Sequence, residues 1–204
     1  MAADDRDRTQ PIVGRRPTKD ELAAYQGATV DDLHADPLRL LFVGINPGLW
    51  TAAVNAHFAR PGNRFWPALH LAGITGDPVD ASLGLPDEAA AELASSGIGI
   101  TNIVPVATAR ADELTTAEVR AGGERLREVV RARRPAVVAV LGVTSFRQAF
   151  GRRDVQVGRD PDGFEGAELW VLPNPSGLNA HETVESLARW YRAAAESAGV
   201  TLHR

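Results

Sequence analysis

The stretch Leu-Leu-Phe-Val-Gly-Ile-Asn-Pro-Gly-Leu, residues 40–49, constrains the fold more than any other part of the chain. Its apolar half is long enough for one buried strand. Pro47 and Gly48 end that strand, because proline lacks an N–H and glycine readily adopts turn conformations. Asn46 therefore lies where a central strand stops, and in α/β proteins ligands bind at this carboxyl edge of the sheet. Asn46 is a candidate polar group in a ligand site, and an ordinary turn is an equally open alternative from this stretch alone.

Further apolar runs alternate along the chain with segments of helical periodicity. We expect strands at residues 40–43, 98–104, 136–141 and 168–172, and helices at 20–25, 65–72, 86–96, 116–132, 144–150 and 182–198. Residues 50–64 and 151–166 are expected to be irregular. Continuous apolar strands between helices are typical of a parallel sheet covered on both faces. The predicted fold class is α/β: a three-layer α/β/α domain with a mostly parallel central sheet.

Length and composition favour one domain with a substantial core, since the chain has 204 residues. We expect residues 1–17, rich in Arg and Asp, to form a disordered tail and residues 18–204 to form a single domain. The absence of cysteine excludes disulfides and thiolate chemistry. A cytoplasmic location is expected, because the first residues are charged and lack the apolar segment of a secretory signal, and no apolar run is as long as a membrane span.

Net charge is −4 at neutral pH, which argues against extensive non-specific binding of nucleic acid. A small basic face remains compatible with that value, because a binding footprint depends on where the charges lie. The sequence therefore excludes a strongly basic nucleic-acid-binding protein but not one that recognises a local DNA structure.

Two loops carry the side chains that could take part in binding or catalysis. Residues 50–64 contain His57 and Phe58, and an aromatic ring in a loop bounded by Pro and Gly can stack on a planar ligand or cap the core. Residues 173–180 follow the last strand and carry Leu178 among small and polar residues. A leucine at such a loop tip can wedge between stacked bases, or it can pack inward.

Common catalytic signatures are absent from the sequence: there is no P-loop, no Gly-x-Gly-x-x-Gly after a strand and no Gly-x-Ser-x-Gly elbow. The five histidines lack metal-ligand spacing, so we expect no metal and no cofactor. Of these histidines, only His57 in the first loop and His181 just after the second lie at the two loops. A lone loop histidine is more often a solvated hydrogen-bonding group than a catalyst.

The order and spacing of four motifs resemble the mismatch-specific uracil/thymine DNA glycosylases, a branch of the uracil-DNA glycosylase superfamily. The motifs are Gly44-Ile45-Asn46-Pro47-Gly48-Leu49, Phe58-x-x-Pro61-x-Asn63-x-Phe65-Trp66, Gly99-Ile100-Thr101-Asn102 and Pro173-Asn174-Pro175-Ser176-Gly177-Leu178. This resemblance covers roughly residues 40–190. It implies a three-layer α/β/α enzyme that flips a damaged base out of duplex DNA and hydrolyses its N-glycosidic bond, the first step of base excision repair.

The resemblance also implies roles for individual residues. Asn46 would position the attacking water, Phe58 would stack on the flipped pyrimidine, and backbone groups beside Ile45 and Phe58 would read the base edge. His57 and Asn102 would lie close to the base. The residues expected to contact DNA lie in the second loop: Ser176 at the phosphate backbone, Gly177, Leu178 and Asn179 as the wedge beside the orphaned guanine, and His181 nearby.

The chemistry implied by the resemblance is consistent with these residue types. A uracil anion is a fair leaving group, so a site with a placed water can succeed without a strong general base, and slow turnover is expected because an amide cannot abstract a proton. The expected partner is double-stranded DNA with G·U or related mismatches, bound by a monomer. Thymine and ethenocytosine are further candidate bases.

The sequence departs from its relatives at a few positions. Pro105-Val106 replaces an acidic–arginine pair that relatives often carry, and the position of Asn102 varies among them. These departures put the substrate range in doubt more than the reaction. Two other functions remain open: a non-catalytic module that binds mismatched or damaged DNA on the same fold, and a hydrolase of free nucleosides, for which the apolar Leu178 would have no purpose.

Overall fold

The computed structural model describes residues 9–203. Within this range the strands are β1 (Leu40–Gly44), β2 (Ile98–Asn102), β3 (Val137–Leu141), β4 (Gly158–Phe164) and β5 (Ala167–Leu172). The α-helices are α1 (Lys19–Leu22), α2 (Leu49–Ala53), α3 (Phe65–Leu71), α4 (Asp87–Ser95), α5 (Thr116–Arg133), α6 (Val143–Phe150) and α7 (Val184–Ser197), and two short 3-10 helices are η2 (Ala23–Tyr25) and η3 (Ala111–Glu113).

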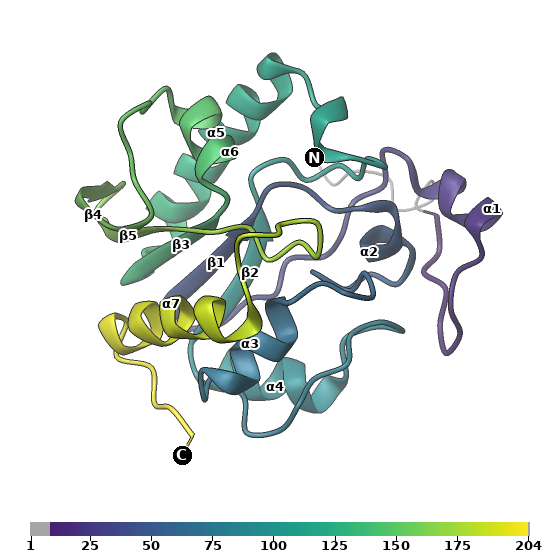
Figure 1. The fold of residues 1–204 in the computed structure, drawn as a ribbon, viewed down its shortest axis with the longest axis horizontal. Coiled ribbons are helices and arrows are strands. Elements are labelled where there is room, and N and C mark those ends of the chain that lie inside the picture. The colour runs from purple at the N-terminus through teal and green to yellow at the C-terminus, as the bar shows by residue number, and fades with distance from the viewer. Residues whose placement is uncertain (1–8, 204) are drawn as a thin grey trace.

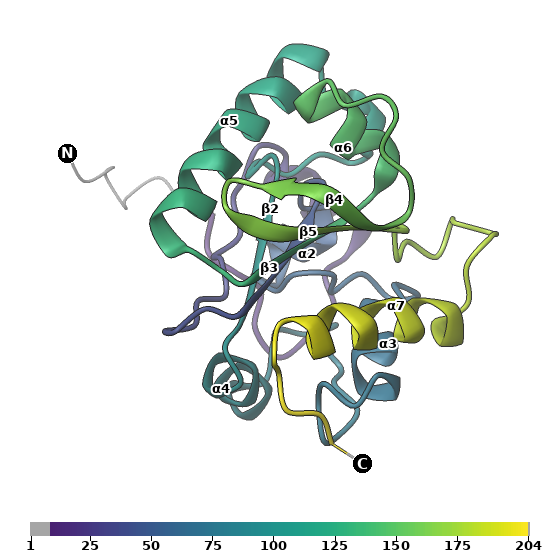
Figure 2. The same ribbon diagram turned by 90° about the vertical axis from the view of Figure 1, so that its left-hand side faces the viewer.

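One sheet organises the molecule, with strand order β2-β1-β3-β5-β4. Strand β1 runs parallel to β2 and β3, and β3 runs parallel to β5; the edge strand β4 is antiparallel to β5. Helices α5 and α6 cover one face of the sheet, and α3, α4 and α7 lie on the other (Figures 1 and 2). The predicted α/β class with a mostly parallel central sheet is confirmed.

The side chains of β1 alternate between two cores. Leu40 and Phe42 pack into a cluster with residues of α3 and α7, whereas Leu41 and Val43 pack into a cluster with residues of α5 and α6. Because both faces are covered, every residue of β1 is buried. This explains why the strand is continuously apolar and does not alternate between apolar and polar residues.

The parallel arrangement brings the chain out of β1, β3 and β5 at the same edge of the sheet. Residues 45–48 follow β1 and residues 173–178 follow β5, so Asn46 and the loop that carries Leu178 share this edge. The intervening β3 ends at Leu141, between them.

Two segments expected to be irregular contain regular structure. Residues 49–53 form α2, which buries Ala52 and Ala53 against Tyr25 and Ala107. A helix this short depends on tertiary packing and leaves no visible periodicity. Residues 158–164 form β4, whose polar sequence lacks an apolar alternation because the strand is held at the sheet edge by its ladder with β5.

The predicted disordered tail covers residues 1–17, of which residues 1–8 lie outside the described part of the chain. Beyond them, the Tyr25 hydroxyl donates to the carbonyl of Gln10 at 2.7 Å, and the Ile12 N–H donates to the carbonyl of Ala53 at 2.7 Å. These contacts attach residues 10 and 12 to η2 and α2.

Candidate active site

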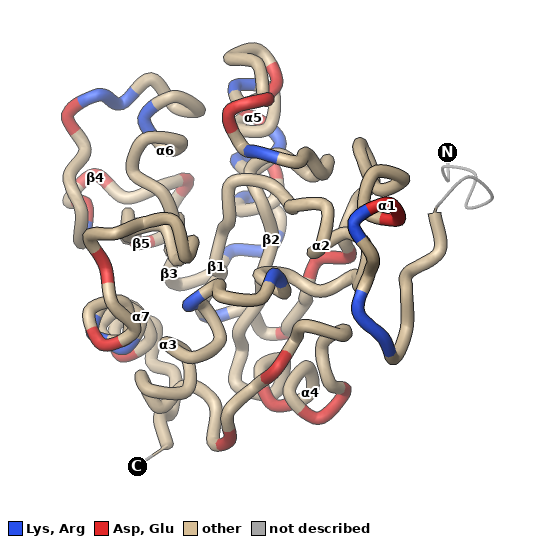
Figure 3. Tube along the Cα trace, turned by 45° about the vertical axis from the view of Figure 1, so that its right-hand side comes forward, with Lys and Arg blue, Asp and Glu red and all other residues tan. Residues whose placement is uncertain are grey.

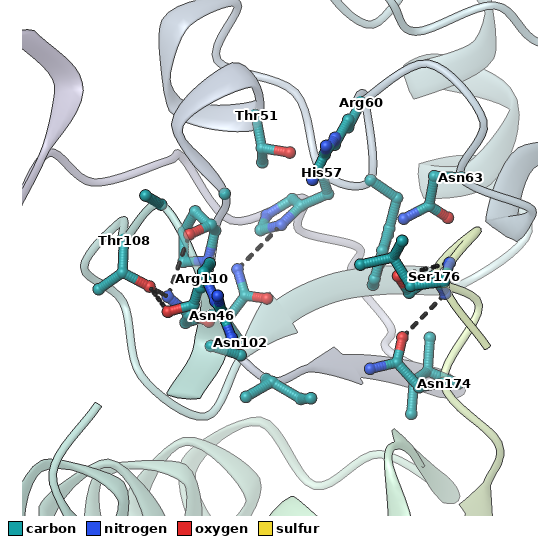
Figure 4. Close-up of a pocket in the computed structure, with 18 of the residues that line it drawn as sticks. Asn46, Thr51, His57, Arg60, Asn63, Asn102, Thr108, Arg110, Asn174 and Ser176 are labelled. Atoms are coloured by element: carbon teal, nitrogen blue, oxygen red, sulfur yellow. Dashed lines mark hydrogen bonds between the residues drawn. The ribbon is translucent and has the colours of Figure 1, made fainter. Parts of the chain in front are cut away.

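A cleft of about 710 Å³ opens at the carboxyl edge of the sheet, and Figure 4 shows how its side chains converge. Several segments far apart in sequence contribute to its lining. They are residues 45–48 after β1, Thr51 in α2, His57, Phe58, Arg60 and Asn63 from the loop before α3, Asn102 at the end of β2, residues 108–112, Leu141, and Asn174, Ser176 and Leu178 after β5. The two loops identified in the sequence therefore flank one cleft.

The side chain of Asn46 is held at this cleft through its amide nitrogen. Nδ2 donates to Oγ1 of Thr108 at 2.8 Å, to the carbonyl of Pro47 at 3.1 Å and to the carbonyl of Val106 at 3.2 Å. Carbonyl oxygens only accept, so these partners fix which end of the amide is nitrogen. Oδ1 accepts no hydrogen bond from any described residue, which leaves it free for a ligand or water in the cleft.

Thr108 completes this arrangement. Its hydroxyl donates to the carbonyl of Arg110 at 2.8 Å, so its oxygen is free to accept the N–H of Asn46. The segment around residues 106–110 was not identified as functional in the sequence. A threonine in a loop gives no local signal, because its role depends on contact with a residue 62 positions earlier.

Phe58 stands at the cleft with one face on the core. Its ring stacks on Phe65 with centroids 4.1 Å apart and an interplanar angle of 25°, and Phe65 is fully buried. Phe58 itself is only half-buried and borders the cleft, so its packing on the core is observed, and stacking on a ligand stays a prediction for this ring. The backbone of Phe58 has φ +55°, a left-handed conformation that is rare for an aromatic residue and marks a tightly constrained position.

Gly44, at the end of β1, makes room for two of the side chains that line the cleft. A Cβ atom at this position would lie 2.3 Å from Oδ1 of Asn102 and 3.1 Å from Cζ of Phe58. The first distance is far below any van der Waals contact. Glycine at the end of β1 is therefore required for close approach, and Asn102 and Phe58 both reach the space above it.

His57 is buried next to Asn102 and does not have the solvated setting usual for a loop histidine. Its Nδ1 lies 3.2 Å from Nδ2 of Asn102, and its Nε2 lies 3.9 Å from Oδ1 of Asp32. Burial lowers the pKa of His57 to about 4, against the opposing effects of Asp32 and Asp31. The imidazole is therefore neutral at pH 7.

The second loop is built on turns stabilised by its own side chains. Oδ1 of Asn174 accepts the N–H of Ser176 at 2.9 Å, and Oγ of Ser176 accepts the N–H of Leu178 at 3.3 Å. The side chain of Leu178 is 86% exposed. Packing inward, the alternative considered for this leucine, is therefore wrong in this structure.

Arg64 holds this loop from the opposite side and was missed in the sequence. Its guanidinium donates to the carbonyls of Asn179 at 2.8 Å and of Ser176 and Gly177 at 3.3 Å each, and its backbone N–H donates to the carbonyl of Pro175 at 3.0 Å. Arg64 thus connects the loop that carries Phe58 with the loop that carries Leu178. Its position inside the Asn63-x-Phe65 motif was the available signal.

The other predicted residues of the second loop, Gly177, Asn179 and His181, lie outside the lining of the cleft. A Cβ on Gly177 would lie 2.7 Å from the carbonyl of Gly62, so this glycine allows the two loops to touch. Nδ2 of Asn179 donates to the carbonyl of Asn174 at 3.0 Å, and His181 is exposed beyond the loop. Ile45 lines the cleft, and its carbonyl accepts the N–H of Val104 at 2.9 Å.

Two searches of the described residues bear on other classes of site. Residues 9–203 include no group of three or more His, Cys, Asp or Glu side chains arranged to hold a metal ion. None of the described helices combines the length and apolar character needed to cross a membrane.

The fold and the cleft place the chain in the class of three-layer α/β/α proteins with a polar cleft at the carboxyl edge of a mostly parallel sheet. Residues 32–196 match the family model of the uracil DNA glycosylase superfamily, and the chain belongs to that superfamily. Membership indicates N-glycosyl hydrolase activity on uracil in DNA.

A solved structure has the same fold. It is the solution NMR structure of a candidate uracil DNA glycosylase from Methanosarcina acetivorans, which is similar to this chain with a TM-score of 0.56 and 18% sequence identity. The similarity covers 83% of this chain and 98% of that one. At this identity the likeness supports the fold alone.

Proposed function

We propose that this protein is a monofunctional, mismatch-specific uracil-DNA glycosylase of the uracil/thymine branch, acting as a monomer on double-stranded DNA. The observation that carries the proposal is the fixed amide of Asn46, which lines the cleft with its nitrogen engaged and its oxygen without a hydrogen bond from any described residue. Such an oxygen can accept a hydrogen bond from a water and hold it for attack on the sugar carbon of a flipped nucleotide.

The reaction would depend more on the position of the attacking water than on removal of its proton by a general base. The amide of Asn46 is too weakly basic to take a proton from water. Glycosidic cleavage passes through an oxocarbenium-like state, and the base leaves as an anion stabilised by hydrogen bonds in a cleft from which water is excluded. Uracil is a better leaving group than an unmodified cytosine, so the proposed site would act slowly and selectively.

Phe58 supports the proposal by offering a stacking surface beside Asn46. The ring is braced from behind by Phe65, so it needs little reorganisation when a flat base enters. Flipping costs a few kcal/mol of lost stacking and pairing and costs least at a mismatch, which favours uracil or thymine opposite guanine. The exposed Leu178 would fill the gap left in the duplex.

The charges near the cleft also favour DNA, although the net charge of the chain is −4. In Figure 3, helix α5 carries acidic and basic segments side by side. Residues 54–64 and residues 173–181 contain no acidic residue, and the exposed Arg60 lines the cleft. Arg110 also lines the cleft but forms an ion pair with Asp112. Arg60 can therefore contact a phosphate beside a flipped nucleotide without a neighbouring acidic residue in its own segment.

The test is cleavage of a duplex panel with uracil, thymine or ethenocytosine opposite each of the four bases. We expect an abasic product from G·U duplexes with the wild type and a large loss with Asn46→Ala. Full activity of Asn46→Ala would remove this residue from the mechanism. Tight mismatch binding without any abasic product would identify a binding module, and activity confined to free deoxyuridine would identify a nucleoside hydrolase.

A further inference from the structure

The contact between His57 and Asn102 has two possible arrangements of hydrogen. The two nitrogens are 3.2 Å apart and both side chains are buried, with about 5% of each exposed. Either Asn102 donates its N–H to an unprotonated Nδ1, or its amide is reversed and its oxygen accepts from a protonated Nδ1. The choice decides which end of the Asn102 amide faces the cleft (Figure 4).

Asp32 favours the first arrangement. Its Oδ1 lies 3.9 Å from Nε2 of His57, which is buried and has no hydrogen-bond partner among the described residues. The distance is too long for a hydrogen bond, but the negative charge of the carboxylate favours a proton on Nε2, which leaves Nδ1 with a lone pair. Arg125 connects Asp32 with Asn102: its guanidinium donates to Oδ2 of Asp32 at 3.2 Å and to the backbone carbonyl of Asn102 at 3.1 Å. The neutral imidazole with its proton on Nε2 must then accept the N–H of Asn102.

With the nitrogen of Asn102 engaged by His57, its oxygen lies beside Gly44, and Asn102 itself lines the cleft. Oδ1 occupies the space above Gly44, where a Cβ atom would lie 2.3 Å away, and Phe58 borders the same space. We propose that His57 is a positioning residue that holds Asn102 with its amide oxygen toward the cleft, where this oxygen accepts a hydrogen bond from a ring N–H of the bound base. This inference rests on the proposed glycosylase function.

The orientation defines the class of base that the cleft accepts. Uracil and thymine carry an N–H at ring position 3, which can donate to Oδ1 of Asn102. Cytosine has a lone pair there and ethenocytosine has a substituted nitrogen, so either base would leave the oxygen without a partner. Sites built around a hydrogen bond to the substrate discriminate strongly against analogues that lack the donor. The cleft is therefore specific for imide bases, and ethenocytosine is a poor substrate.

The experiment compares uracil with 3-deazauracil, which has the same shape but a C–H at position 3, each opposite guanine in a duplex. The variants are His57→Phe, which removes the acceptor; His57→Gln, which can restore one; and the exposed His34→Phe as a matched control. Because the two bases differ in intrinsic reactivity, the measured quantity is the change in the ratio of their kcat/KM values between variants.

We expect His57→Phe to lower this ratio about 10-fold or more, His57→Gln to retain most of it, and His34→Phe to leave it at the wild-type value. An equal loss on both bases in His57→Phe would show a merely structural role and overturn the proposal. If His57→Phe does not fold, the half-buried Asp32 offers a second variant. Asp32→Asn is expected to lower the same ratio of kcat/KM values.

A measurement independent of activity separates this inference from the proposed function. In ¹⁵N NMR spectra of the wild type at pH 7, we expect His57 to carry its proton on Nε2. A proton on Nδ1 would overturn the proposal even if uracil is excised. A wild type that excises no uracil would instead refute the glycosylase assignment, while the tautomer would still decide the orientation of Asn102.

Discussion

The amide nitrogen of Asn46 lies 2.8 Å from the hydroxyl oxygen of Thr108, which in turn donates its proton to the carbonyl of Arg110. Thr108→Val keeps the shape of the side chain and removes this acceptor. A neutral hydrogen bond contributes about 0.5–1.5 kcal/mol, so we expect kcat on a G·U duplex to fall about 3- to 10-fold. Single-turnover rates at saturating enzyme would measure the change.

The matched control is Thr75→Val, because Thr75 is also buried but its hydroxyl has no hydrogen-bond partner among the described residues. We expect it to cleave at the wild-type rate. An unchanged rate in Thr108→Val would mean that the two backbone carbonyls alone orient Asn46.

Phe58→Leu tests the stacking surface while retaining an apolar side chain over Phe65. The loss of one base–aromatic stack is expected to weaken handling of the flipped base by about 1–3 kcal/mol, since leucine offers no flat face. The effect should appear in kcat/KM for a G·U duplex, with thermal stability changed less than in Phe58→Ala. Wild-type kinetics for Phe58→Leu would assign this ring to the core alone.

Arg64→Met removes the guanidinium that binds the carbonyls of Ser176, Gly177 and Asn179. The loop that carries Leu178 would lose its fixed shape. A wedge is needed only when a base must be extracted from a duplex, so we expect about a 10-fold or greater loss on G·U duplexes and less than about a 3-fold loss on single-stranded uracil DNA.

Arg120→Met is the control for Arg64→Met, because Arg120 is exposed on α5. It should show neither loss. Equal losses on single- and double-stranded substrates in Arg64→Met would contradict a role through the wedge and would indicate general damage to the cleft.

The buried His57 makes stability depend on pH in a definite direction. Burial lowers its pKa from 6.5 to about 4 in the folded protein, so the unfolded chain takes up a proton first as the pH falls. Above pH 6.5 both states carry a neutral His57, and its titration does not affect the free energy of unfolding. Between pH 6.5 and pH 4 the free energy of unfolding falls by about 3 kcal/mol in total.

This dependence can be isolated by denaturant unfolding of the wild type and of His57→Phe at pH 7 and pH 4. The variant lacks the titrating group, so the difference in unfolding free energy between the two proteins should shrink by about that amount at pH 4. A difference that stays constant would mean that the folded protein accommodates a charged His57.

Much of the fold could be predicted from local sequence patterns. The apolar runs of β1 and β3 indicate strands covered on both faces, and the stripe of α5 indicates an amphipathic helix. The elements that were missed, α2 and β4, carry no periodic signal. A five-residue helix is stabilised by its contacts with η2, and a polar edge strand by its backbone ladder with β5.

The sequence by itself determined where the polar loops lie: Asn46 had to follow a buried strand, and Leu178 had to stand in a loop of small and polar residues. Only the tertiary structure decided how the amides are oriented. Thr108 orients Asn46 from 62 residues away along the chain. Asp32 acts on His57 across 25 residues, and His57 orients Asn102 across 45 residues. A hydrogen bond between distant side chains leaves no periodicity in a sequence, because its geometry exists only after the sheet has brought the strand ends together.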